Sequence, residues 1–271
     1  SHNLQHPRYI GHQCCAPLPA AALADLTGNF LNNASAVYEM GPVNIAMEKR
    51  LIQWMAKLAG YDEQADGIFT NGGTLGNLTA LLAARQYQAE YNVWKEGVDG
   101  SRPMAVLDSE PCHYSVKRAV GVMGLGEDAV YEVAADDSYK MDLQSLRIQY
   151  DKAEAEGRKV IALVANGCST ATGTYDDLNP IADFTREREI WLHVDAAHGG
   201  AALVSDTYRH LLTGIERADS FVWDAHKMLM IPALATGIVF KEGRRSYESF
   251  SQKASYLFEE DPEDEWFNYA H

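Results

Sequence analysis

The chain has 271 residues, of which 46% are hydrophobic and 23% charged, and it carries a formal net charge of -15 at pH 7. This length and apolar content suffice for one large domain or two small ones with a substantial core, as in a soluble globular protein. The acidic excess excludes an extended nucleic-acid or anionic-membrane surface, because either would need a basic field to attract phosphate.

Cysteine usage and the apolar runs favour a cytoplasmic protein. No cysteine has the CxxC or Cys/His spacing of a metal site, so we expect no metal, and an adjacent cysteine pair does not suit a disulfide framework. The longest apolar stretch, Met228–Phe240, is interrupted by proline, threonine and glycine and is too short to span a bilayer. No charged-then-apolar signal pattern opens the sequence. The cysteines are Cys14, Cys15, Cys112 and Cys168.

Short apolar runs alternate with segments that carry apolar residues at helical spacing. Continuous apolar strands separated by amphipathic helices are typical of a mostly parallel sheet with helices on both faces, so we predict an α/β fold. The expected helices are Ala20–Leu31, Asn44–Ala59, a segment ending at Tyr87, a segment from about Tyr114, and Leu143–Glu156. The expected strands are Gly67–Thr70, Met104–Leu107, Ala129–Tyr131, Val160–Val164, Ile190–Val194, Phe221–Trp223 and Gly237–Phe240.

A glycine turn follows the first expected strand. The sequence Asn71-Gly72-Gly73-Thr74 joins this strand to a helix, where free backbone amides, a hydroxyl and the helix dipole favour a phosphate. The same residues also fit a plain Gly-Gly turn in which Thr74 caps the helix. The spacing matches neither the P-loop nor the GxGxxG dinucleotide pattern, which argues against a nucleotide.

A carboxylate and an amine follow two later strands. Asp195, in His193-Val194-Asp195-Ala196-Ala197, ends an apolar strand and needs a partner, either a protonated pyridine nitrogen or a helix cap or salt bridge. Lys227, in Asp224-Ala225-His226-Lys227, is either an exposed lysine or an amine that condenses with an aldehyde. Both follow parallel strands at the usual ligand side of an α/β sheet. Together they predict a site for pyridoxal 5'-phosphate.

Two further polar residues lie where strands end. His113 follows the strand around Val106, and it is either a structural histidine or a ring that stacks on the cofactor and exchanges protons with the substrate Cα. Thr170 follows Val160–Val164 and is either a turn residue or a hydroxyl that contacts the cofactor ring oxygen or the substrate carboxylate. The ordered set of glycine turn, histidine, threonine, aspartate and His-Lys favours the functional interpretation.

These motifs resemble the large domain of the group II pyridoxal-phosphate-dependent amino-acid decarboxylases, which act on aromatic amino acids, glutamate, cysteine sulfinate or 2,4-diaminobutyrate. The resemblance covers nearly the whole chain and includes His6-Pro7-Arg8-Tyr9 and Asn71–Arg85. It implies the large domain of a fold-type I pyridoxal-phosphate enzyme. The catalytic residues that it implies are Lys227, Asp195, His113 and Thr170. The cofactor-binding residues that it implies are Gly73, Thr74, His113, Thr170, Asp195, Ala197, Asp224, His226 and Lys227.

The sequence departs from the family in three places. Asp224 stands where many members have asparagine, and its carboxylate would repel a phosphate dianion unless water or a proton intervenes. Gly11-His12-Gln13-Cys14 replaces the asparagine-glutamine pair of the animal glutamate and cysteine-sulfinate enzymes, so acidic-substrate specificity is not carried over. His12 and Gln13 become candidates for the substrate pocket. The sequence ends at His271, where family members continue, and we expect the small C-terminal domain to be absent.

The predicted organisation is an N-terminal segment, 1–40, that contributes to the substrate pocket and dimer contacts, followed by a pyridoxal-phosphate-binding large domain, 41–271. The expected activity is the decarboxylation of an L-amino acid to an amine and carbon dioxide by a cytoplasmic homodimer. The same fold and cofactor also allow an aminotransferase, an aldolase, a carbon-carbon lyase or a cofactor-binding chain without turnover, because cofactor residues do not determine which Cα bond breaks.

Overall fold

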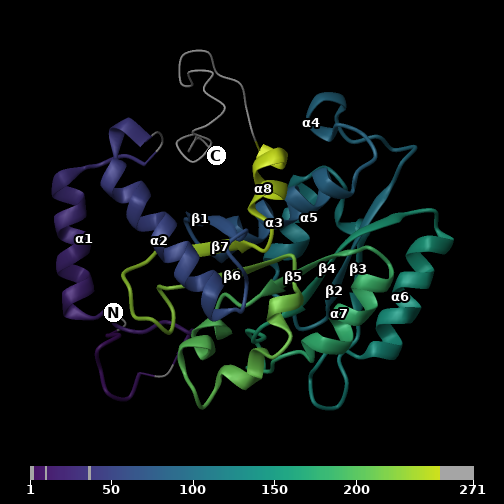
Figure 1. The fold of residues 1–271 in the computed structure, drawn as a ribbon. Coiled ribbons are helices and arrows are strands. Elements are labelled where there is room, and N and C mark those ends of the chain that lie inside the picture. The colour runs from purple at the N-terminus through teal and green to yellow at the C-terminus, as the bar shows by residue number, and fades with distance from the viewer. Residues whose placement is uncertain (1–2, 10, 36–37, 251–271) are drawn as a thin grey trace.

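The computed structural model describes residues 3–9, 11–35 and 38–250, so the predicted large domain is seen as far as residue 250 and its remainder lies outside the described residues. One seven-stranded sheet has the order β1-β7-β6-β5-β4-β2-β3, and every strand except β7 runs in the same direction (Figure 1). The predicted mostly parallel α/β sheet is confirmed. The strands are β1 Asp66–Thr70, β2 Met104–Ser109, β3 Val130–Val133, β4 Lys159–Asn166, β5 Trp191–Asp195, β6 Ser220–Asp224 and β7 Thr236–Phe240.

Helices cover both faces of the sheet, as predicted. Helices α3, α5 and α8 pack on one face, whereas α2, α6 and α7 pack on the other (Figure 1). Helices α4, α7 and α8 were not expected from the sequence. Among the described residues, no helix is both long and apolar enough to cross a membrane. The helices are α1 Pro19–Leu31, α2 Pro42–Leu58, α3 Gly73–Gln88, α4 Val93–Glu96, α5 Ser115–Val122, α6 Leu143–Ala155, α7 Leu178–Glu187 and α8 Gly243–Phe250.

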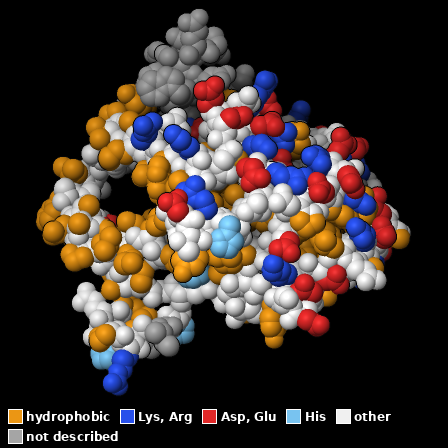
Figure 2. Space-filling view, turned by 60° about the horizontal axis from the view of Figure 1, so that its bottom comes forward, with side chains coloured by type: hydrophobic (Ala, Val, Ile, Leu, Met, Phe, Trp, Pro, Cys, Tyr) orange, Lys and Arg blue, Asp and Glu red, His pale blue; other side chains and the backbone are white. Residues whose placement is uncertain are grey.

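Helix α1 buries none of its residues. Pro19 favours the start of the helix because its missing N–H would have no helical partner there, and Asn32 ends the helix in the left-handed region. The apolar side chains of α1 remain exposed, Phe30 to 81%. Figure 2 shows hydrophobic side chains gathered on the side of the molecule where α1 and α2 lie. Helix α1 therefore presents an apolar surface that the described residues leave uncovered.

Side chains of β5 alternate between the two faces of the sheet, as the period of two in a strand requires. Leu192 and Val194 join the hydrophobic cluster under α2, α6 and α7, whereas Trp191 joins the cluster under α3 and α5. His193 and Asp195 share the second face with Trp191. The strand thus directs two polar side chains toward α3 at the carboxyl edge of the sheet.

Helix α3 approaches β6 closely because Gly76 lies at the contact. A Cβ atom at Gly76 would lie 2.7 Å from Cγ1 of Val222, well inside van der Waals contact. Val222 is fully buried, so its side chain has little space to move. The glycine therefore fixes how near the amino end of α3 lies to the sheet.

We expect Gly76→Ala to lower the free energy of unfolding by about 1–3 kcal/mol, because the added methyl overpacks a closed contact. Gly28→Ala in α1 is the matched control, since a Cβ there meets nothing within 4 Å. The control should raise the free energy of unfolding by up to about 1 kcal/mol through helix propensity alone. Urea unfolding measures both, and a Gly76→Ala protein as stable as wild type would contradict the close contact.

Candidate active site

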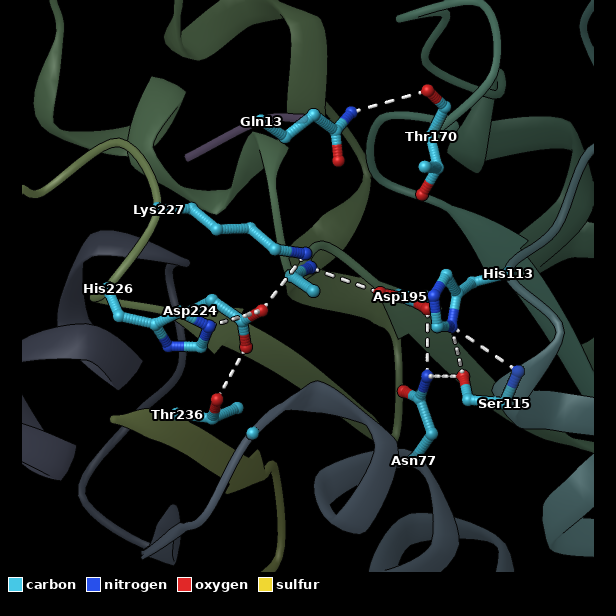
Figure 3. A network of polar contacts seen from close by, with 12 residues as sticks. Gln13, Asn77, His113, Ser115, Thr170, Asp195, Asp224, His226, Lys227 and Thr236 are labelled. Carbon is cyan, nitrogen blue, oxygen red and sulfur yellow. Dashed lines mark hydrogen bonds and ion pairs between the residues drawn. The ribbon is translucent and has the colours of Figure 1, made fainter. Parts of the chain in front are cut away.

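A cavity of about 300 Å³ lies at the carboxyl edge of the sheet, where the ends of β1, β4, β5 and β6 meet the amino end of α3. All nine residues expected to contact the cofactor line this one cavity, from segments separated by up to 154 positions in the sequence. Figure 3 shows several of them converging. These nine residues are Gly73, Thr74, His113, Thr170, Asp195, Ala197, Asp224, His226 and Lys227.

Asp195 ends β5 and is only 7% exposed. Its Oδ2 accepts a hydrogen bond of 2.8 Å from Nδ2 of Asn77, and its Oδ1 accepts one of 3.1 Å from the backbone N–H of Ala197. Two N–H donors stabilise a carboxylate that burial would otherwise destabilise. The Asp195 side chain is thereby held at the cavity with a fixed orientation.

A second buried carboxyl group, that of Asp108 on β2, lies near Asp195. Burial is the main cause that raises the pKa of Asp108 to about 8, and the negative charge of Asp195 contributes. The Asp108 carboxyl group is therefore protonated at neutral pH. It adds no second negative charge beside Asp195.

Lys227 reaches the cavity from the segment after β6. Its Nζ lies 3.0 Å from Oδ2 of Asp224, whose side chain is only 2% exposed. The other carboxylate oxygen of Asp224 accepts a hydrogen bond of 2.5 Å from Oγ1 of Thr236 on the neighbouring strand β7. Nε2 of His226 lies 3.6 Å from the same carboxylate. Asp224 thus joins the amine to the end of the sheet (Figure 3).

The glycine turn leads from β1 into α3 and forms one wall of the cavity. Gly72 has a φ of +100°, a conformation that residues with a Cβ rarely adopt. A Cβ at Gly73 would lie 3.2 Å from both the Ala197 Cβ and Oδ1 of Asp224. The first N–H groups of a helix have no partner within it, so those of Gly73 and Thr74 are available to an anion. The Asp224 carboxylate nevertheless lies against this turn.

His113 precedes α5 and is held by the first residue of that helix. Nδ1 of His113 lies 2.8 Å from Oγ of Ser115, and its ring contacts the ring of Tyr114 at 4.1 Å between centroids, tilted by 37°. Burial is the main cause that lowers the pKa of His113, so the imidazole is neutral at neutral pH. A neutral ring carries one proton, and its position depends on the hydrogen bonds that the ring makes.

The two substrate-pocket candidates differ in position. Nε2 of Gln13 lies 3.4 Å from the carbonyl oxygen of Thr170, so Gln13 lies at the rim of the cavity. His12 is exposed and does not line the cavity. Sγ of Cys15 lies 2.7 Å from the carbonyl oxygen of Lys227. The N-terminal segment therefore lies beside the site, through Gln13 and Cys15 and not through His12.

Three further residues of this region were not predicted from the sequence, namely Asn77, His193 and Asn166. Asn77 lies one helical turn after Gly73 on the buried face of α3, where a polar residue among alanines and leucines was the available signal. His193 lies two positions before Asp195 and therefore on the same face of β5. Asn166 ends β4 and lines the cavity, and its Nδ2 is buried without a hydrogen-bond partner. An unpaired buried donor of this kind is available to a ligand.

Comparisons with known proteins agree with this geometry. Residues 11–269 match the family described as the pyridoxal-dependent decarboxylase conserved domain. Cysteine sulfinic acid decarboxylase of Homo sapiens is 36% identical over 257 residues, which are 94% of this chain and 52% of that protein. L-2,4-diaminobutyrate decarboxylase of Acinetobacter baumannii is 30% identical over 266 residues, which again cover 94% of this chain and 52% of that protein.

The fold agrees with a solved relative as well. The crystal structure of mouse CSAD superposes with a TM-score of 0.88 at 32% identity and covers 94% of this chain and 53% of that one. The chain thus spans about half the length of the relatives that it matches. The family match and these relatives show that the chain belongs to the pyridoxal-dependent decarboxylase family.

Proposed function

We propose that this protein uses pyridoxal 5'-phosphate to decarboxylate an L-amino acid, giving the corresponding amine and carbon dioxide. The observation that carries the proposal is that the Lys227 amine and the Asp195 carboxylate line one cavity together with His113. The bound cofactor would supply an electron sink for the carbanion that is left when carbon dioxide departs. Membership of the family supports the same reaction class.

The residues at one wall of the cavity fit the cofactor phosphate. The N–H groups of Gly73 and Thr74 would bind phosphate oxygens, and the helix dipole of α3 favours negative charge at this point. The absence of a side chain at Gly73 leaves the space that a Cβ would fill. His226 also lines the cavity and would donate a hydrogen bond to the phosphate. Asp224 is the one group here whose charge opposes a phosphate.

The residues at the other wall fit the pyridine ring. Asp195 would hold the ring nitrogen protonated, and His113 would stack on the ring face. The methyl group of Ala197 and the hydroxyl of Thr170 would contact the ring and its oxygen. The unpaired Nδ2 of Asn166 supports this assignment, because it provides a buried donor for the ring oxygen or the substrate carboxylate.

The Lys227 amine would bind the cofactor aldehyde carbon, and it must give up a proton to do so. Oδ2 of Asp224, 3.0 Å from Nζ, is placed to accept that proton. The neutral imidazole of His113 would exchange a proton with the substrate Cα. A position of the substrate carboxylate away from bulk water would favour its departure as neutral carbon dioxide, with the electron pair of the broken bond left on Cα.

The proposal includes a cytoplasmic homodimer, in which residues 1–40 contribute to the substrate pocket and the dimer contacts and 41–271 bind the cofactor. Gln13 and Cys15 support the first role, because they touch the segments that carry Thr170 and Lys227. The exposed apolar side chains of α1 support the second, because a surface of this kind is typical of an interface. The four cysteines are free thiols, which supports a reducing compartment.

The reaction is tested by incubating the purified protein with pyridoxal 5'-phosphate and a panel of L-amino acids. Mass spectrometry should detect an amine and carbon dioxide in equal amounts for at least one substrate. Lys227→Ala should lower the rate at least 1000-fold, whereas Lys152→Ala on the exposed surface of α6 should leave it unchanged. A 2-oxo acid as product, or bound cofactor with no product from any substrate, would contradict decarboxylation.

We expect Asp224→Asn to bind pyridoxal 5'-phosphate about tenfold more tightly, because it removes a negative charge beside the phosphate wall and can still accept from Thr236. Fluorescence titration of the cofactor measures the dissociation constant. Asp206→Asn is the matched control, since that side chain is 99% exposed and removes the same charge from the surface. Weaker binding by Asp224→Asn would show that the carboxylate contributes favourably to the site.

The homodimer is tested by light scattering at micromolar concentration. We expect wild type to have the mass of two chains, and Phe30→Glu on α1 to weaken association at least tenfold by placing a charge in the apolar interface. Ile148→Glu is the control, because Ile148 is a 58% exposed apolar residue on α6. A monomeric wild type, or equal association of both variants, would contradict an interface at α1.

A further inference from the structure

A buried chain of hydrogen bonds runs from β5 and β6 to α3. Nε1 of Trp191 lies 2.9 Å from Oγ of Ser220, Oγ of Ser220 lies 2.9 Å from Nδ1 of His193, and Nε2 of His193 lies 2.9 Å from Oδ1 of Asn77. All four side chains are at most 1% exposed. No bulk water competes for these groups, so each bond direction is set by the donors and acceptors present.

The direction of this chain can be assigned at each step. An indole N–H can only donate, so Ser220 accepts from Trp191 and keeps its own hydroxyl proton for Nδ1 of His193. Complete burial is the main cause that lowers the pKa of His193, so its ring is neutral. Its single proton lies on Nε2, because this nitrogen faces Oδ1 of Asn77, an amide oxygen that can only accept. That proton is donated to Oδ1 of Asn77. The amide nitrogen of Asn77 must then point the other way.

The amide nitrogen of Asn77 donates to two groups. One hydrogen bond of 2.8 Å goes to Oδ2 of Asp195, and the other, of 2.9 Å, goes to Oγ of Ser115 (Figure 3). An ionised carboxylate only accepts, which agrees with the nitrogen facing Asp195. The backbone N–H of Ser115 donates to Nδ1 of His113 over 3.3 Å, and the Ser115 hydroxyl, which accepts from Asn77, directs its own proton to the same nitrogen, 2.8 Å away. Nδ1 of His113 is therefore an acceptor, and Nε2 carries the proton.

We propose that Asn77 is a positioning residue that sets the orientation of Asp195 and the tautomer of His113 together. His193, held by Ser220 and Trp191, fixes the Asn77 amide in the orientation that this requires. The effect of Asn77 on cofactor binding rests on the proposed function. The proton positions on the two histidine rings do not, because they are already set in the cofactor-free protein. One amide thus couples the group expected at the pyridine nitrogen to the ring expected to stack on the cofactor.

The proton positions are tested by NMR of the cofactor-free protein with 15N-labelled histidine, in which two-bond couplings distinguish a protonated from an unprotonated ring nitrogen. The variants His113→Gln and His193→Gln assign the two sets of signals. We expect both wild-type rings to be neutral at pH 7.5 with the proton on Nε2. A proton on Nδ1 of either ring would overturn the proposal.

The coupling is tested with three variants. Asn77→Asp keeps the side-chain shape but replaces the shared donor with an acceptor, so it should change the His113 signals and weaken pyridoxal 5'-phosphate binding at least tenfold. Ser115→Ala cuts only the branch to His113, so it should change the same signals and weaken binding less than threefold. Asn92→Asp, at the exposed N-cap of α4 where aspartate caps as well as asparagine, adds the same charge and should change neither.

Circular dichroism confirms that each variant is folded before it is compared. Equal cofactor binding by Asn77→Asp and wild type, or unchanged His113 signals in that variant, would overturn the coupling. If wild type binds no pyridoxal 5'-phosphate at all, the proposed function fails, and the tautomers of the cofactor-free protein still decide the inference.

Discussion

The hydrogen bond from Asn77 to Asp195 is the interaction on which the arrangement of this site depends. A carboxylate that ends an apolar strand is costly to bury, and the structure offsets that cost with N–H donors from α3 and from Ala197. This bond requires α3 to lie close to the sheet, which Gly76 permits. The same close approach brings the glycine turn at the start of α3 to the edge where β5 and β6 end. The close contact of α3 with the sheet at Gly76 therefore determines both the core packing and the geometry of the site.

The direction of the strands accounts for the rest of the site. Because β1, β4, β5 and β6 run in parallel, the segments that follow them all leave the sheet at one edge. The antiparallel strand β7 begins at that edge, and so its first residue, Thr236, can hold Asp224. The carboxylate of Asp224 lies beside the glycine turn and would repel a cofactor phosphate bound there. It is also the group that pairs with the Lys227 amine.

Much of the fold was predictable because the strands are short apolar runs bounded by polar residues, a local signal. Helix α7 was missed because it spans only ten residues and begins with Leu178-Asn-Pro, which is typical of a loop. The antiparallel direction of β7 was not predicted, since an apolar run does not encode direction. Asn77 and His193 could not be paired from the sequence, because their bond joins positions 116 residues apart and depends on how α3 packs.

We propose that Lys227 and Asp195 form one cofactor site at the carboxyl edge of the sheet. The most direct measurement is to incubate the protein with pyridoxal 5'-phosphate, reduce it with borohydride and map the modified peptide by mass spectrometry. We expect a single pyridoxyl group, on Lys227. A pyridoxyl group on any other lysine, or no modification at saturating cofactor, would contradict it.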